Sequence, residues 1–269
     1  LAVENFRKYL RIRTVQPAPD YEGCAAFLKE LAADVGLAYR RVEPVSGKPL
    51  LILTWKGTEP SLPSIILNSH TDVVPVFPEQ WTQDPFGAAR VPQKNGDYKI
   101  YARGAQDMKI VGISYVEALR RLKQTGWQPR RTLHLTFVPD EEIGGSDGMQ
   151  AFINNGGLAE LNPGFCLDEG KPPGLANPED AYKLYYAERV TWWIHVTAHG
   201  NTGHGSQFIA GTAASKLVGF INEMLKFREE QEQLMKDKQL RLGEVTTVNL
   251  NLLKGGVQIN VVPEEAQAG

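Results

Sequence analysis

The stretch RTLHLTFVPDEEIGG, residues 131–145, joins an apolar run to a row of three carboxylates and two glycines. Its first half, TLHLTFV, is short, apolar and rich in branched and aromatic residues, which predicts a buried β-strand. Asp140, Glu141 and Glu142 follow directly, where that strand should end. Because like charges repel, three carboxylates in a row at the end of a buried strand indicate that positive charge lies nearby.

The sequence around this strand alternates between expected strands and helices. The expected helices are VENFRKYLRIRTV (3–15), YEGCAAFLKELAADVG (21–36) and MKIVGISYVEALRRLKQTG (108–126). The expected strands are LLILTWKG (50–57), SIILNSH (64–70) and DYKIYARGAQD (97–107). Strands that alternate with helices predict an α/β fold, with a mainly parallel sheet covered by helices on both faces.

The pattern changes after about Tyr186, and the change predicts a second, smaller domain. A strand, VTWWIHVTAHG (190–200), precedes a long helix, TAASKLVGFINEMLKFREEQEQL (212–234), and two further strands, EVTTVNLNLLKGG (244–256) and VQINVVPEE (257–265). This order is typical of an α+β domain. We expect a first domain at 1–186 and a second at 187–269. Both are expected to be incomplete at the C-terminus, because the chain stops at Gly269 just after a strand-like segment.

Composition excludes several classes of function. The 269 residues are 42% hydrophobic and 22% charged, with a net charge of −2, which is ordinary for a globular protein and argues against nucleic-acid binding. No apolar run is long enough to span a bilayer, and the first residues lack the pattern of a signal peptide. Cys24 and Cys166 lie far apart, so we expect two buried free thiols and a cytoplasmic location.

Titratable side chains follow four of the expected strands or turns. They are His70 and Asp72, then Asp107, then Glu141 and Glu142, and finally Asp168 and Glu169. In an open parallel sheet, ligands bind beyond the carboxyl ends of the strands. One imidazole and several carboxylates at one edge would repel one another unless a divalent cation lay between them. Mixed nitrogen and oxygen ligands suit zinc, and manganese or cobalt would also fit.

Each of these clusters also has an ordinary structural explanation. A lone histidine at a strand end is usually a hydrogen-bonded polar residue, and an acidic row before glycines is usually a solvated turn or a helix N-cap. LDEG (167–170) by itself fits any loop. The coincidence of all four clusters at strand ends favours a metal site, although spacing alone does not name an enzyme.

Four motifs, in order, resemble the metal-site motifs of the M20 metallopeptidase family. They are NSHTDVVPVF (68–77), IYARGAQDMK (100–109), TFVPDEEIGG (136–145) and LDEG followed by ANP (167–178). The resemblance runs along essentially the whole chain and is strongest to the family's aminoacylase branch, the zinc N-acyl-amino-acid hydrolases. It implies a zinc aminopeptidase-like catalytic domain with an inserted α+β dimerisation or lid domain.

The resemblance also implies a site with two Zn²⁺ ions. His70 resembles a ligand of the first zinc, with Asp72 orienting it, and Asp107 resembles the carboxylate that bridges both ions. Glu142 resembles a ligand of the second zinc, and Glu169, rather than Asp168, a ligand of the first. Glu141 resembles the general base, whereas Asp140 is expected to be only a turn or supporting residue. The implied reaction hydrolyses N-acyl-L-amino acids to a carboxylic acid and a free L-amino acid.

Two residues of the second domain match further positions of the family. His204, in GNTGHGSQF, resembles a histidine that reaches the active site of the other subunit of a homodimer. Asn260, in GGVQINVVP, resembles an asparagine that contacts the substrate. Without the resemblance, His204 would be taken for a polar loop residue between two glycines and Asn260 for an ordinary strand residue.

The chain also departs from the family pattern. The family supplies one more histidine ligand from a segment that would lie beyond Gly269, so the 269-residue chain by itself is expected to be inactive. KPPGLANP (171–178) and ARVPQKNGDYK (89–99) both look longer than usual, and the second is expected to be a surface hairpin. Two alternatives stay open: an M20 di- or tripeptidase, or a truncated, non-catalytic paralogue that dimerises or binds a partner.

Overall fold

The computed structural model describes residues 1–170, 186–187 and 189–269, which fall into two compact units. Unit 1 comprises residues 1–183 and unit 2 residues 184–269. The proline-rich segment 171–178, including ANP, lies outside the described residues.

Unit 1 is built on a five-stranded sheet with the order β1-β2-β6-β3-β7. The strands are β1 (Ala38–Val45), β2 (Lys48–Trp55), β3 (Ser64–His70), β6 (Leu133–Val138) and β7 (Pro163–Leu167). β3 runs parallel to both β6 and β7, whereas β1 pairs with β2, and β2 with β6, in antiparallel fashion.

The sheet is therefore mixed, which corrects the prediction of a mainly parallel one. β1 and β2 are joined through Gly47, whose φ of 75° is the left-handed conformation that a tight hairpin turn favours. A hairpin places its two strands antiparallel. β1 itself has no counterpart among the expected strands, because its residues, AYRRVEPV, are half-buried or exposed and include three charged residues and a proline.

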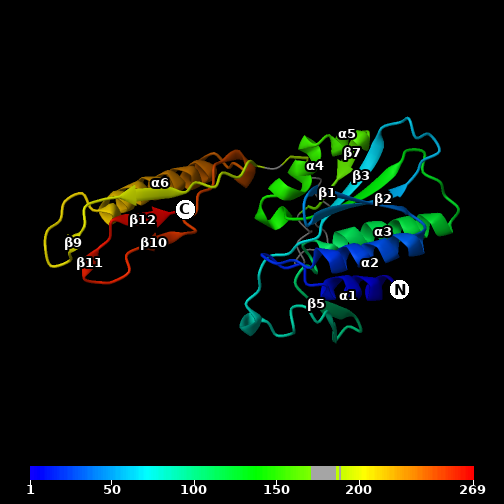
Figure 1. Cartoon of the computed structure of the whole chain (residues 1–269), viewed down its shortest axis with the longest axis horizontal. Helices are drawn as coiled ribbons and strands as arrows, with labels where there is room; N and C mark the ends of the chain where they lie inside the picture. Colours follow the sequence, from blue (N-terminus) through cyan, green and yellow to red (C-terminus); the bar gives the residue numbers. More distant parts are fainter. Residues whose placement is uncertain (171–185, 188) are drawn as a thin grey trace. The chain divides into compact units, whose positions relative to one another are not determined.

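Helices cover both faces of the sheet, as the α/β pattern predicts (Figure 1). On one face lie α1 (Ala2–Arg11), α2 (Tyr21–Val35) and α3 (Lys109–Gln124), and on the other α4 (Ala151–Asn154) and α5 (Gly157–Glu160). Side chains of β2 alternate between two buried clusters: Leu51 and Leu53 pack on the larger helices, and Leu50 and Ile52 on the smaller ones. This period of two is the geometry of a strand buried on both faces.

Local signals set the ends of the main helices. The side chain of Asp20 accepts a hydrogen bond from the Gly23 N–H at the start of α2, and Gly36 ends that helix in the left-handed conformation. α3 is followed by Gly126 at a φ of 76°. The observed helices α1, α2 and α3 agree with the expected ones to within a few residues.

Two local expectations need qualification. The strand expected at 97–107 is only β5 (Tyr98–Tyr101), and it pairs with β4 (Ala89–Pro92) in a separate hairpin rather than with the main sheet. Cys24 is buried, but Cys166 is exposed, because it lies on β7 at the edge of the sheet. Both thiols are free.

Unit 2 packs one long helix, α6 (Ala213–Asp237), on a small antiparallel sheet with the order β10-β12-β8. Its strands are β8 (Val196–His199), β10 (Leu253–Gly255) and β12 (Glu265–Ala268), and β9 (Gly203–His204) pairs with β11 (Val261–Val262) separately. Ala213 and Leu217 of α6 pack on Ala266 and Ala268 of β12. The strand expected from Val190 begins only at Val196, which pairs with Ala268. None of the helices in the described ranges is long and apolar enough to cross a membrane.

Candidate metal centre

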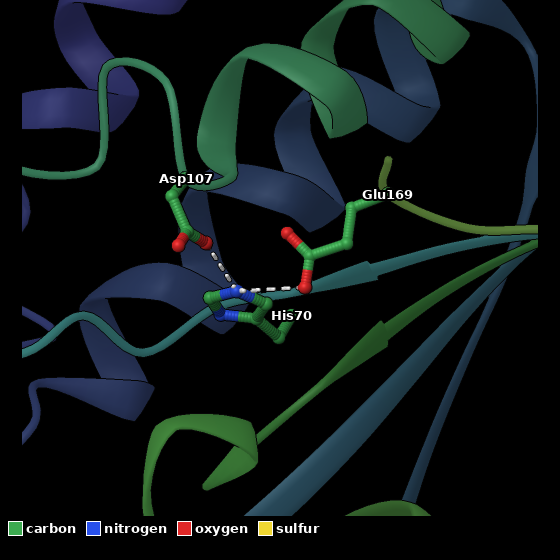
Figure 2. A group of neighbouring side chains, drawn as sticks. All are labelled: His70, Asp107 and Glu169. Carbon is green, nitrogen blue, oxygen red and sulfur yellow. Dashed lines mark hydrogen bonds and ion pairs between the residues drawn. The ribbon is translucent and has the colours of Figure 1, made fainter. Parts of the chain in front are cut away.

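Three side chains from separate segments meet beyond the carboxyl end of β3 (Figure 2). His70 is the last residue of β3, Asp107 lies in the loop before α3, and Glu169 follows β7. His70 Nε2 is 2.9 Å from Asp107 Oδ1 and 4.0 Å from Glu169 Oε1. One ligand atom of each residue lies within 4.8 Å of the others. The His70 ring is buried, whereas both carboxylates are partly open to solvent.

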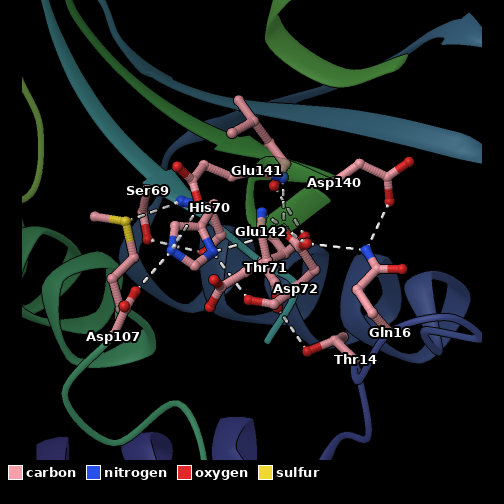
Figure 3. A network of polar contacts seen from close by, with 12 residues as sticks. Thr14, Gln16, Ser69, His70, Thr71, Asp72, Asp107, Asp140, Glu141 and Glu142 are labelled. Carbon is pink, nitrogen blue, oxygen red and sulfur yellow. Dashed lines mark hydrogen bonds and ion pairs between the residues drawn. The ribbon is translucent and has the colours of Figure 1, made fainter. Parts of the chain in front are cut away.

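The other ring nitrogen of His70, Nδ1, contacts Asp72. Nδ1 lies 2.9 Å from the backbone carbonyl oxygen of Asp72 and 3.6 Å from its carboxylate. Asp72 thus orients His70, as the resemblance implies, but the nearer acceptor is its backbone oxygen rather than its carboxylate. The carboxylate of Asp72 instead accepts the backbone N–H groups of Glu141 and Glu142, at 3.0 and 3.2 Å (Figure 3). The acceptor on Nδ1 presents Nε2 to the cluster, as metal-binding histidines require.

The turn after β6 brings its two glutamates to this cluster in different ways. Glu141 Oε2 lies 3.8 Å from His70 Nε2. The carboxylate of Glu142 is not part of the compact group of His70, Asp107 and Glu169. It is close enough for the negative charge of Asp107 to raise its pKa, after the larger effect of burial.

Negative charge is poorly balanced at this edge of the sheet. Burial and the neighbouring carboxylate of Asp107 raise the pKa of Glu169 to about 7. Burial raises the pKa of Glu141 as well, and nearby carboxylates add to that effect. Burial alone would lower the pKa of His70, but its hydrogen bonds to Asp107 and Asp72 raise it to about 11. The raised pKa values of Glu141 and Glu169 are those of partly buried carboxylates with other negative charges nearby.

The donor set fits a divalent metal. An imidazole nitrogen and carboxylate oxygens converge on one point, and such mixed sets bind zinc and related ions. The three residues come from the end of β3, the loop before α3 and the segment after β7, and they lie together in the structure.

Supporting contacts hold the segments that carry Glu169 and Asp107. Asp168 accepts the backbone N–H of Glu169 at 2.9 Å and the side-chain amide of Asn68 at 3.0 Å, so Asp168 faces the sheet and Glu169 the cluster. Lys109 is buried and donates to the backbone oxygens of Tyr9 and Ile12, which ties the loop carrying Asp107 to the end of α1. Burial lowers the pKa of Lys109 to about 8.

Three supporting residues have no signal in the sequence. Gln16, Tyr21 and Lys48 surround the buried carboxylate of Asp140 at the start of the glutamate turn. Burial would raise the pKa of Asp140, but its bonds to Lys48, Tyr21 and Gln16 lower it. Each residue lies in an ordinary turn, helix start or strand start, so local pattern could not have found it.

His204 and Asn260 lie together in unit 2. His204 is on β9 opposite Val261 of β11, and its Nδ1 is 2.7 Å from Ser206 Oγ. The backbone oxygen of Asn260 accepts the Gly205 N–H at 2.9 Å. The His204 side chain is exposed. His134, on β6, contacts Thr54 Oγ1 at 2.8 Å as a sheet residue.

Comparison with known proteins finds a matching family and relatives along nearly the whole chain. The model of peptidase family M20/M25/M40 matches residues 66–249. Pig (Sus scrofa) aminoacylase-1 is 53% identical over 267 residues, covering 99% of this chain and 64% of that protein. Human aminoacylase-1 is 51% identical over 268 residues with the same coverage, and the Dictyostelium discoideum protein is 45% identical. The chain thus spans about 64% of the length of these mammalian relatives.

Solved structures share the fold. An M20 family metallo-carboxypeptidase from Sulfolobus solfataricus aligns with a TM-score of 0.67 at 17% identity, over 99% of this chain and 69% of that one. A tripeptidase from Staphylococcus aureus aligns with a TM-score of 0.61 at 18% identity, over 99% and 64%. At such identities the likeness concerns fold only.

Proposed function

Because this chain belongs to peptidase family M20/M25/M40, we propose that it carries the zinc site of a hydrolase acting on N-acyl-L-amino acids. The observation that carries the proposal is the convergence of His70, Asp107 and Glu169 on one point, with Glu141 beside them. The choice of substrate class follows from the 51–53% identity to mammalian aminoacylase-1 along 99% of the chain. The products would be a carboxylic acid and a free L-amino acid.

The proposed metal ligands divide between two Zn²⁺ ions. His70 and Glu169 would bind the first ion, Glu142 the second, and Asp107 both. When bound, divalent zinc lowers the pKa of water and polarises a carbonyl oxygen. Burial raises the pKa of Glu142, and Glu142 is near enough to Asp107 for the negative charge of Asp107 to raise it further, which supports a place for both beside the second ion.

Glu141 is the proposed general base. Its raised pKa and its place 3.8 Å from His70 Nε2 suit a group that takes a proton from the attacking water and gives it to the leaving amine. Asp72 would position both His70 and Glu141. Its backbone oxygen contacts the His70 ring, and its carboxylate accepts the backbone N–H of Glu141.

We assign residues 1–186 to the catalytic domain and 187–269 to an inserted dimerisation or lid domain. In a homodimer, His204 would reach the active site of the other subunit and stabilise the developing oxyanion. Asn260, which lies beside the His204 loop, would contact the same substrate. The two free thiols suit a reducing compartment, and we propose the cytoplasm.

The test of the activity is a comparison of two substrates in the intact protein. One is an N-acetyl-L-amino acid, and the other is a dipeptide with the same C-terminal residue and a free amine. We expect release of the free amino acid from the first at a much higher kcat/KM, lost with a chelator and restored by zinc. Preference for the dipeptide would instead identify a peptidase. Zinc binding without turnover of either would identify a non-catalytic paralogue.

The role of His204 across a dimer has its own test. A mixed dimer combines one subunit carrying His204→Asn with another carrying Glu141→Gln. One of its two sites then has both an intact base and an intact histidine, so activity should return to about half of the parent's if each site works independently. Activity no higher than that of the two single-variant dimers would refute the assignment.

A further inference from the structure

The turn that carries Glu141 and Glu142 begins at a buried residue in a left-handed conformation. Asp140 has φ 60° and ψ 24°, and its side chain is 1% exposed. A residue other than glycine adopts this region uncommonly, and it persists where the surroundings hold it. The direction in which the chain leaves β6, and with it the placement of both glutamates, therefore depends on what contacts Asp140.

Tyr21 and Lys48 hold Asp140 from one side. The Tyr21 hydroxyl accepts the backbone N–H of Asp140 at 2.9 Å and donates to its Oδ1 at 2.5 Å. One hydroxyl group thus binds both the backbone and the side chain of the same residue, which fixes one relative to the other. Lys48 Nζ lies 2.5 Å from Oδ2 and supplies the balancing charge.

Gln16 joins Asp140 to Asp72. Its Nε2 donates to Asp140 Oδ1 at 3.0 Å and to Asp72 Oδ2 at 2.9 Å (Figure 3). All three side chains are buried. Two buried carboxylates would repel each other, and the NH₂ group of glutamine offers two donor hydrogens on one uncharged nitrogen. A glutamate at position 16 would add a third carboxylate, which can only accept hydrogen bonds. An apolar residue would remove one hydrogen-bond donor from each of the two aspartates.

Asp72 in turn is hydrogen-bonded to the backbone of both glutamates. Asp72 accepts the backbone N–H groups of Glu141 and Glu142, and its backbone oxygen contacts the ring of His70. The turn is therefore held at its start through Asp140 and at its next two residues through Asp72. Gln16 lies between these two points of attachment.

We propose that Gln16 is a positioning residue: by joining Asp72 to Asp140, it fixes the backbone of Glu141 and thereby the direction of the Glu141 carboxylate. The catalytic part of this inference rests on the hydrolase function proposed above. Its structural part, the fixing of the turn, does not. Gln16 acts through the two aspartates and is not itself a catalytic residue.

The structural part is tested by amide hydrogen exchange in the metal-free protein. Gln16→Met keeps the length of the side chain and removes its hydrogen bonds, and Tyr21→Phe removes the hydroxyl on Asp140. The matched control is Tyr9→Phe, since the buried Tyr9 hydroxyl contacts Cys24 Sγ at 3.9 Å. With Leu135 in β6 as the internal reference, loss of one buried hydrogen bond should speed exchange at the Glu141 and Glu142 amides about tenfold. The control should leave the ratio unchanged.

The catalytic part is tested by kinetics on the same variants of the intact protein. A displaced base affects the transition state and spares substrate binding, so Gln16→Met and Tyr21→Phe should lower kcat at least about tenfold with KM nearly unchanged. Zinc content should match the parent, and Tyr9→Phe should behave as the parent does.

Each result decides between the two proposals. Unchanged exchange at Glu141 and Glu142, or an equal change in Tyr9→Phe, would overturn the positioning role of Gln16. Faster exchange with an unchanged kcat would overturn its catalytic part. If the parent protein hydrolyses neither substrate while exchange changes as expected, the hydrolase function fails and the fixing of the turn stands. Should Gln16→Met not fold, Gln16→Asn decides in the same way, because it keeps a side-chain amide that is one methylene too short to join Asp72 to Asp140.

Discussion

Replacing Glu141 by glutamine should remove most of the hydrolytic rate and leave the fold intact. Glutamine has the shape of glutamate but cannot accept a proton at neutral pH. The backbone N–H of residue 141 can still donate to the carboxylate of Asp72, so the turn should keep its position. A general base contributes about 10²–10⁴ in rate, which corresponds to about 3–5 kcal/mol of activation free energy. We expect kcat to fall by that factor.

The structure also predicts the sign of the effect on stability. Burial raises the pKa of Glu141, His70 partly offsets this, and Asp72 and Asp107 raise it further. A raised folded-state pKa means that this group's contribution is fully present below its unfolded pKa and is lost as the pH rises through the folded value. At pH 7, above the unfolded pKa, Glu141 therefore opposes folding of the metal-free protein. The glutamine variant should unfold at an equal or higher temperature.

Three measurements separate these effects: kcat from amino-acid release, zinc per subunit by atomic emission, and Tm with and without chelator. Glu142→Gln is the matched variant, one residue along the same turn, and should lose zinc rather than proton transfer alone. If Glu141→Gln lost its zinc and Glu142→Gln did not, the two roles would be reversed. A Glu141→Gln variant with full kcat would refute the general-base assignment.

Three further predictions concern stability and metal affinity. Phe152→Ala, on the buried side of α4, should destabilise unit 1 by about 3–5 kcal/mol, measured by urea unfolding; a cost near zero would mean that this face is not packed as described. Burial, and then Arg40, lower the pKa of His134, so the parent should lose stability as the pH falls below about 6.5 and His134→Gln should lose less; parallel curves would contradict this. Because the pKa of Glu169 in the metal-free protein is about 7, the Tm difference between zinc-loaded and chelated protein should grow from pH 5.5 to about pH 8, and a constant difference would exclude Glu169 as a ligand.

Much of unit 1 could be predicted from its sequence because its signals are local. Apolar periodicity and capping residues such as Asp20 and Gly36 act within one turn of a helix, so α1, α2 and α3 fall where expected. His70, Glu141, Glu142 and Glu169 were equally accessible, because they stand at or just after strands of the main sheet, whose ends meet at one edge. Asp107 lies in the loop before α3, and the strand that precedes it belongs to a separate hairpin.

The strand pairing was less predictable. β1 carries three charged residues and a proline and is half-buried or exposed, so its sequence resembles a surface loop, and only its ladder with β2 makes it a strand. The antiparallel pairing of β2 with β6 likewise depends on partners more than 70 residues apart, such as Leu53 and Leu135. In unit 2 the exposed residues Trp192 and Trp193 have the composition of a strand, but the described ladder with β12 starts only at Val196.

The sequence by itself therefore determined the α/β class, the main helices and the candidate residues His70, Asp107, Glu141, Glu142 and Glu169. Only the tertiary structure decided that the sheet is mixed and that Gln16, Tyr21 and Lys48 hold the turn of Asp140. The physical reason is the range of the interactions. Helix caps and strand alternation join residues a few positions apart, whereas the hydrogen bond from Gln16 to Asp140 joins residues 124 positions apart and leaves no trace in either local sequence.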